Sequence, residues 1–173
     1  MARILTDREI GDLLAEPKRL LRTWEKRLEP QAKTGDTQAR RSLRVTGKNG
    51  NRFRIDVRDN SKSYFDFSII LSFIDADGEE YILVRFNGKT PSDHTNRWEK
   101  KQGKPNAKFR SAFHIHMATE RYQLSPECKI DGYAEVTDRY HSLKSALIAF
   151  VSSNGFEVER DENEAKGQLS LFD

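Results

Sequence analysis

The sequence predicts an α+β domain whose sheet is mostly antiparallel, with helices before and after it. Apolar and polar residues alternate strictly in residues 52–58, which is typical of a half-buried strand. Residues 47–50 have the composition of a tight hairpin turn and separate this segment from a second alternating one. Helical spacing of apolar residues is confined to the two ends of the chain. We therefore expect N-terminal helices, a meander of about five strands and a C-terminal helix.

Residues 1–36 are expected to form an N-terminal helical segment. Thr6 and Glu9 have the spacing of a capping box, so a first short helix begins there. Pro17 suits the first turn of a second helix, and the apolar residues that follow it have helical spacing. These residues are Leu20, Leu21, Trp24 and Leu28. Basic residues cover the rest of this second helix. They form either the solvated face of a helix that docks on the domain or a surface that contacts nucleic acid.

Residues 37–158 are expected to form the α+β domain itself. The predicted strands span residues 40–46, 52–58, 64–74, 80–86, 113–117 and 133–137, with an edge strand at 156–158. The most apolar segment, 64–74, is expected to be a central strand, followed by a hairpin turn. Asp138 or Ser142 is expected to cap the last helix, which ends at Asn154 and Gly155.

Two histidines alternate with apolar residues in segment 113–117. On a strand, His114 and His116 share one face, while Phe113, Ile115 and Met117 point to the other. The apolar face would attach the strand to the core, and the opposite face would present two imidazoles side by side. Because imidazole ligates metals and transfers protons near neutral pH, this strand is the main candidate for chemistry.

A long polar insertion, residues 87–108, precedes this strand and contributes His94. Loops of this length in a compact domain are usually functional or mobile. Three interpretations of the histidines stay open. They ligate a divalent metal together with His94, Glu120 or Asp93; they act as acid and base without a metal; or they only form hydrogen bonds within the sheet face.

The candidate catalytic residues are His94, His114, His116, Glu120 and Arg121. Cationic residues in or near the insertion are candidates for binding nucleic-acid phosphates. They are Arg85, Lys89, Lys100, Lys101 and Lys104. In a metal-free mechanism, Arg121 and Tyr122 would also neutralise a phosphate. A divalent metal at His114 and His116 is the one cofactor that the sequence suggests, and its identity stays open.

The composition excludes several classes of protein. One cysteine among 173 residues cannot form an internal disulfide framework and fits a reducing cytoplasm. No apolar run is long enough to span a membrane and the first residues lack the apolar stretch of a signal peptide, so we expect a cytoplasmic protein without a membrane partner. The sequence also lacks a glycine-rich phosphate loop, a dinucleotide-binding fingerprint and a nucleophile elbow.

Residues 159–173 are predicted to be a disordered acidic linker that ends in a docking peptide. The last residues are Gln168-Leu-Ser-Leu-Phe-Asp173. Their three apolar side chains follow a solvated linker, so they have no hydrophobic core to join. Residues 168–172 resemble the bacterial sliding-clamp-binding pentapeptide, whose consensus is Gln-Leu-Ser/Asp-Leu-Phe. The alternative is a terminal segment that folds back on its own domain or pairs as an edge strand.

The clamp resemblance implies a role for each residue of the peptide. Gln168 would make polar contacts at the rim of the clamp pocket. Leu171 and Phe172 would fill the apolar cleft, and Leu169 would pack beside them. Ser170 occupies the position at which the consensus accepts serine or aspartate.

A second resemblance concerns the folded domain. Arg85-Phe-Asn87, His94 and Phe113-His-Ile-His116 are similar to the Arg-x-Asn/Asp…His…His-x-His layout of TumE-type toxins of toxin–antitoxin systems. The similarity covers about residues 64–122. The family would imply an α+β fold, a growth-inhibiting activity and an antitoxin protein as partner.

Three functions follow as hypotheses. The first is a sliding-clamp-binding protein that acts at, or interferes with, bacterial DNA replication or repair. The second is a histidine-dependent nuclease toxin of a toxin–antitoxin or phage-related system, and the third is a non-catalytic adaptor for DNA or RNA. The first is compatible with either of the others, because tethering to the clamp raises the local concentration of the domain at DNA.

Overall fold

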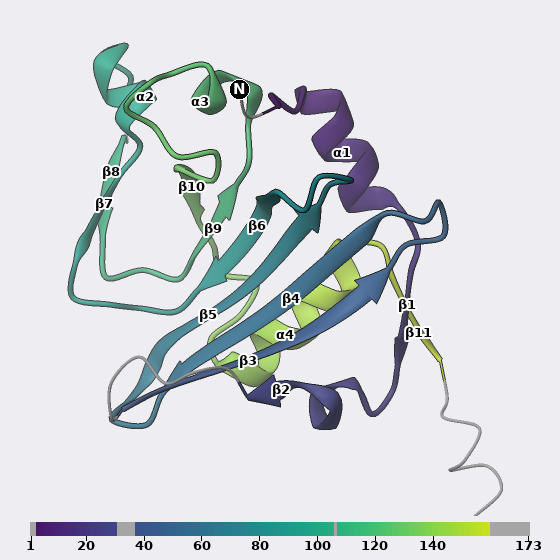
Figure 1. The fold of residues 1–173 in the computed structure, drawn as a ribbon. Coiled ribbons are helices and arrows are strands. Elements are labelled where there is room, and N and C mark those ends of the chain that lie inside the picture. Colours follow the sequence, from purple (N-terminus) through teal and green to yellow (C-terminus); the bar gives the residue numbers. More distant parts are fainter. Residues whose placement is uncertain (1–2, 31–36, 106, 160–173) are drawn as a thin grey trace, which may run out of the picture.

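The computed structural model describes residues 3–30, 37–105 and 107–159, and a seven-stranded antiparallel sheet dominates it (Figure 1). The sheet strands are β2 (Glu29–Pro30), β3 (Gln38–Thr46), β4 (Arg52–Asn60), β5 (Ser63–Ile74), β6 (Glu80–Asn87), β9 (His114–Met117) and β10 (Tyr133–Val136). Their order in space is β10-β9-β6-β5-β4-β3-β2, so each pairs with the next sheet strand along the chain. The predicted α+β class and antiparallel meander are confirmed.

One face of the sheet packs against α4 (Leu143–Ser153), which lies behind β4 and β5 in Figure 1. Phe53, Ile55 and Val57 of β4 point to this side and are almost fully buried, as their alternation predicts. Phe150 of α4 is buried in the same core. Of the two predicted caps, Ser142 is correct, because its hydroxyl accepts a hydrogen bond from the first turn of α4.

The opposite face of the sheet is polar, and a row of side chains crosses it from β3 to β9. The successive cross-strand partners in this row are Arg40, Arg58, Ser68, Asn87 and His114. Directly opposed residues on neighbouring strands share a face. The arginine-bearing face of the β3–β4 hairpin therefore continues across the sheet to the histidine strand.

The N-terminal segment begins as predicted and then departs from the prediction. In α1 (Asp7–Ala15), Thr6 and Glu9 form the expected capping box, each side chain accepting a hydrogen bond from the other residue's backbone N–H. The predicted second helix is wrong. The chain after Pro17 forms β1 (Lys18–Leu21), the 3₁₀ helix η1 (Trp24–Arg27) and β2.

Long-range contacts explain this departure. β1 pairs in parallel with β11 (Phe156–Glu159), a strand that ends a single residue beyond the predicted domain boundary at 158. Lys18 is completely buried, and its Nζ donates hydrogen bonds to backbone oxygens that include those of Leu13 and Asn154. These oxygens lie at the C-terminal ends of α1 and α4, so Lys18 joins both helices to β1.

The insertion between β6 and β9 has its own secondary structure. It forms β7 (Asp93–Thr95), α2 (Arg97–Lys101) and β8 (Lys108–Arg110), with β7 and β8 paired antiparallel. After β9, the chain forms α3 (Glu120–Gln123) before it returns as β10. In Figure 1 these pieces gather around the β9 end of the sheet, where the histidine strand lies.

Candidate metal centre

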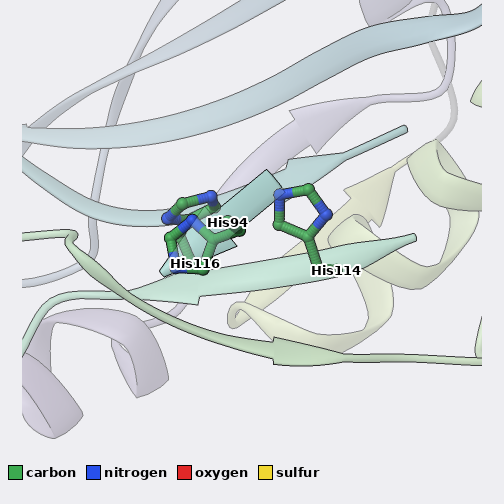
Figure 2. Close-up of side chains that lie close together, drawn as sticks. All are labelled: His94, His114 and His116. Carbon is green, nitrogen blue, oxygen red and sulfur yellow. The ribbon is translucent and has the colours of Figure 1, made fainter. Parts of the chain in front are cut away.

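Three of the four histidines of the chain converge beside β9 (Figure 2). The ring centres of His114 and His116 are 5.0 Å apart. The ring centre of His94 lies 5.7 Å from that of His114 and 4.7 Å from that of His116. One nitrogen from each ring lies within 4.8 Å of the other two. The three side chains therefore form a group that could hold a metal ion.

Strand alternation and the insertion together build this group. Phe113 and Ile115 are buried in the core on the α4 side, as predicted. His114 and His116 point to the polar face, opposite residues of β6. His94 comes from β7, so the insertion delivers the third imidazole to the face on which the other two stand.

Backbone oxygens determine which nitrogen carries the proton in two of the rings. His114 Nδ1 lies 2.7 Å from the backbone oxygen of Ala112, and His116 Nδ1 lies 2.8 Å from that of Asp131. A carbonyl oxygen can only accept a hydrogen bond, so both Nδ1 atoms donate. In the neutral rings, the Nε2 atoms of His114 and His116 therefore keep their lone pairs.

Asn96 determines the proton position in the third ring. Its Oδ1 accepts from the Ala134 N–H and its Nδ2 donates to the Ala134 oxygen, both at 2.8 Å, which fixes the orientation of the amide. His94 Nε2 lies 2.9 Å from the same Oδ1 and must donate to it, so the lone pair is on Nδ1. Each imidazole thus donates one N–H to an oxygen and keeps a lone pair on its other nitrogen, the pattern by which proteins orient histidine ligands.

Burial lowers the pKa of all three imidazoles, because removal from water disfavours the charged form. The guanidinium of Arg85 adds repulsion in each case, and the pKa of His116 falls to about 3. The rings are therefore neutral near pH 7, which is the form that binds metals. A histidine acid–base pair would need one protonated ring at that pH, so the electrostatics favour metal ligation over metal-free acid–base chemistry.

Two side chains of β6 complete the surroundings of the cluster. Asn87 Nδ2 lies 3.2 Å from His114 Nε2, while its Oδ1 is buried and lacks a hydrogen-bond partner among the described residues. An amide turned by 180° would direct this oxygen toward an ion bound at His114, which would satisfy it. Arg85 Nη2 lies 2.6 Å from Oδ2 of the buried Asp131, and this carboxylate balances the charge of the guanidinium.

A cavity of about 870 Å³ opens beside His94 and His116. Its cationic lining residues are Arg85, Arg97, Lys100, Lys101 and Lys129. Its carboxylates are Asp93, Glu127 and Asp131. The positive charges exceed the negative ones, so this cavity would attract an anion to the edge of the histidine cluster.

The other predicted catalytic residues are not part of the histidine group. The backbone N–H of Glu120 donates to Asp7 Oδ1 at 2.8 Å, and its carboxylate accepts from the Asp7 N–H, so Glu120 contacts the start of α1. Asp93, the other carboxylate considered as a ligand, lies 2.6 Å from the amine of Lys108. Arg121 lines a second cavity, separate from the one beside His94 and His116.

The predicted nucleic-acid contacts lie in three places. Arg85, Lys100 and Lys101 line the histidine cavity. Lys104 lines the second cavity. Lys89 lies apart from both, with its Nζ 4.7 Å from the ring centre of Phe113.

Sequence reasoning missed the residues that orient the imidazoles. Ala112 and Asp131 act on the rings through backbone oxygens, which any residue type would supply. Asn96 acts through its side chain, and the one available signal was a polar residue in a long insertion. Its second partner, Ala134, is 38 residues away in the sequence, so spacing could not reveal the contact.

Comparison of the chain with protein families, curated proteins and solved structures finds no match. Among the described residues, no helix is long and apolar enough to cross a membrane. The predicted clamp-binding peptide, residues 168–172, lies outside the described residues.

Proposed function

We propose that the folded domain is a metal-dependent nuclease in which His94, His114 and His116 hold a divalent ion. The observation that carries this proposal is the grouping of the three rings, in which one nitrogen of each lies within 4.8 Å of the other two. Each ring donates one N–H to an oxygen and keeps a lone pair on its other nitrogen. Three imidazoles suit zinc, cobalt and related transition metals better than magnesium. Three protein ligands are also the usual number in a catalytic site that keeps an open position.

A bound ion would supply a Lewis acid and a water of lowered pKa. The chain's own residues would supply the electrostatic environment of the substrate. Arg85 lies beside His116 and lines the cationic cavity, so its guanidinium can bind a phosphate oxygen next to the cluster. Lys100 and Lys129 line the same cavity and would hold neighbouring phosphates of the backbone.

The polar face of the sheet supports a long anionic substrate. Arg40 and Arg58 oppose one another on β3 and β4 in the row that leads to His114. Their side chains are 46% and 40% exposed, so they remain accessible to a ligand on this face. Asp56 and Asp66 neutralise part of this charge, which favours moderate affinity over a tight electrostatic clamp.

Cleavage of labelled RNA and DNA with Mn²⁺, Co²⁺ or Zn²⁺ tests this proposal. His94→Ala, His114→Ala and His116→Ala should each reduce the cleavage rate more than about 100-fold, because even residues that only orient ligands are worth 10- to 100-fold. His141→Ala is the matched control, since His141 is exposed and outside the cluster. Binding without cleavage would support the adaptor hypothesis, and metal-independent cleavage would contradict the proposal.

We also propose that the chain docks on the bacterial sliding clamp through residues 168–172. The support is the agreement with the clamp consensus at all five positions, at the end of a charged segment. Docking would raise the concentration of the nuclease at replicating or repaired DNA. Growth inhibition, as the resemblance to TumE-type toxins implies, would follow from cleavage at that place.

A pull-down with purified sliding clamp tests the docking proposal. Deletion of residues 168–173 should abolish retention of the clamp, because it removes the apolar side chains that the pocket would bind. Ser170→Asp is the matched control and should retain binding, since the consensus accepts either residue there. Equal retention of the clamp by the deleted and complete chains would refute the docking proposal.

A further inference from the structure

A second cavity, of about 740 Å³, lies next to the histidine cluster and is lined by different residues. Phe109 of β8 lies between this cavity and the histidine cluster. Its ring centre is 4.9 Å from that of His94 and 5.1 Å from that of His114, and the same side chain lines the second cavity. Asn96, which orients His94, also lines it. A ligand in this cavity would therefore lie close to the proposed metal centre.

Cations and aromatic rings alternate along the second cavity. Lys104 Nζ lies 4.8 Å from the ring centre of Trp98. The guanidinium carbon of Arg121 lies 5.5 Å from the ring centre of Trp98 and 4.5 Å from that of Tyr133. Such pairs are attractive because the face of an aromatic ring carries negative charge. Planar and cationic groups therefore line the cavity in turn.

Glu99 fixes the middle of this arrangement. It is 8% exposed, and its Oε1 accepts hydrogen bonds from Arg121 Nε at 3.1 Å and from Arg121 Nη2 at 2.8 Å. Its Oε2 accepts from the hydroxyl of Tyr122 at 2.6 Å. These hydrogen bonds hold the guanidinium of Arg121 in one place. Lys104, in contrast, is exposed, so its amine can leave the face of Trp98.

We propose that this second cavity is a stacking subsite for an unpaired base of single-stranded nucleic acid. The base would stack on Trp98 in the place of the Lys104 amine, and that amine would pair with an adjacent phosphate. Arg121 and Tyr133 offer further planar surfaces on which a neighbouring base can stack. The inference rests on the proposed function, because it places the next phosphodiester beside the histidine cluster. Any base fits, since every base has a stacking face.

Fluorescence anisotropy with a labelled single-stranded oligonucleotide tests the subsite in the full-length protein. Trp98→Leu and Tyr133→Leu should each weaken binding about 10-fold or more, because they remove a stacking surface. Trp98→Phe should restore most of the affinity. Phe65→Leu is the matched control, because Phe65 is an aromatic residue of β5 that is 46% exposed, packs near Phe113 on the other face of the sheet and does not line the cavity. Unchanged affinity in both leucine variants would overturn the inference.

Two further measurements separate this inference from the proposed nuclease. Trp98→Leu should bind Co²⁺ as the wild type does, and His114→Ala should lose Co²⁺ but still bind the oligonucleotide. If the wild type bound no Co²⁺ while stacking still depended on Trp98 and Tyr133, the metal centre would be refuted and the base subsite upheld.

A fully paired duplex should bind at least about 10-fold more weakly than the single strand, because its bases are already stacked on one another. Equal affinity for the duplex would overturn the subsite.

Discussion

His116 is neutral in the folded, metal-free protein, because burial lowers its pKa to about 3 from the ordinary 6.5. The unfolded chain takes up a proton at this residue below pH 6.5, while the folded chain does not. The unfolded state then binds more protons, so the free energy of unfolding falls as the pH falls. Between pH 6.5 and pH 5, His116 alone should account for about 2 kcal/mol of lost stability. The pKa values of His94 and His114 are shifted in the same direction and add to the loss.

Urea unfolding of the chelator-treated protein at pH 7 and pH 5 measures this loss. The window lies above the ordinary pKa of carboxylates, so the histidines dominate it. His116→Asn should reduce the difference between the two pH values, because asparagine does not titrate and can still donate to the Asp131 oxygen. The same free energy of unfolding at both pH values would contradict the burial of neutral imidazoles.

The histidine positions were predictable at the scale of residues, but the state of the rings was not. Alternation with Phe113 and Ile115 placed His114 and His116 on one face, and the structure confirms it. The proton positions depend on oxygens that come from other segments, namely those of Asn96 and Asp131. Only the folded chain brings these atoms to the rings.

At the scale of elements, local patterns predicted most strands correctly and one helix wrongly. Leu20, Trp24 and Leu28 are buried, as their helical spacing indicated, yet they belong to β1, η1 and the residue before β2. Periodicity identified which side chains are buried. It could not identify the backbone conformation, because β1 depends on pairing with β11, whose residue Phe156 lies opposite Lys18. Strand pairing over such a distance overrides local helical preference.

The insertion between β6 and β9 is the element on which the site depends most. The length of residues 87–108 predicted a functional or mobile segment, and His94 was a candidate in both the metal and the acid–base interpretation. The β7–β8 hairpin carries His94 and Phe109 to the cluster. α2 between them carries Trp98 and Glu99 to the second cavity. One inserted segment thus contributes to both proposed sites.

At the scale of the whole molecule, one face of the sheet is apolar and buried, and the other is polar. Helix α4 covers one face (Figure 1) and packs into the core there. The other face carries arginines and ends at the histidine cluster. The two-stranded β1–β11 sheet, after which residues 160–173 follow, lies on the other side of the molecule from β9 in this view. The last described strand, β11, is therefore separated from the proposed nuclease site by the large sheet.

A titration of the purified, metal-free protein with Co²⁺, followed by visible absorption, tests the central claim most directly. The metal centre predicts the bands of a tetrahedral or five-coordinate Co²⁺ site that saturate at a single ion per chain. The His94→Ala, His114→Ala and His116→Ala variants should each lose these bands, and His141→Ala should keep them. A wild-type protein without the bands, or a cluster variant that retains them at the same affinity, would contradict the claim.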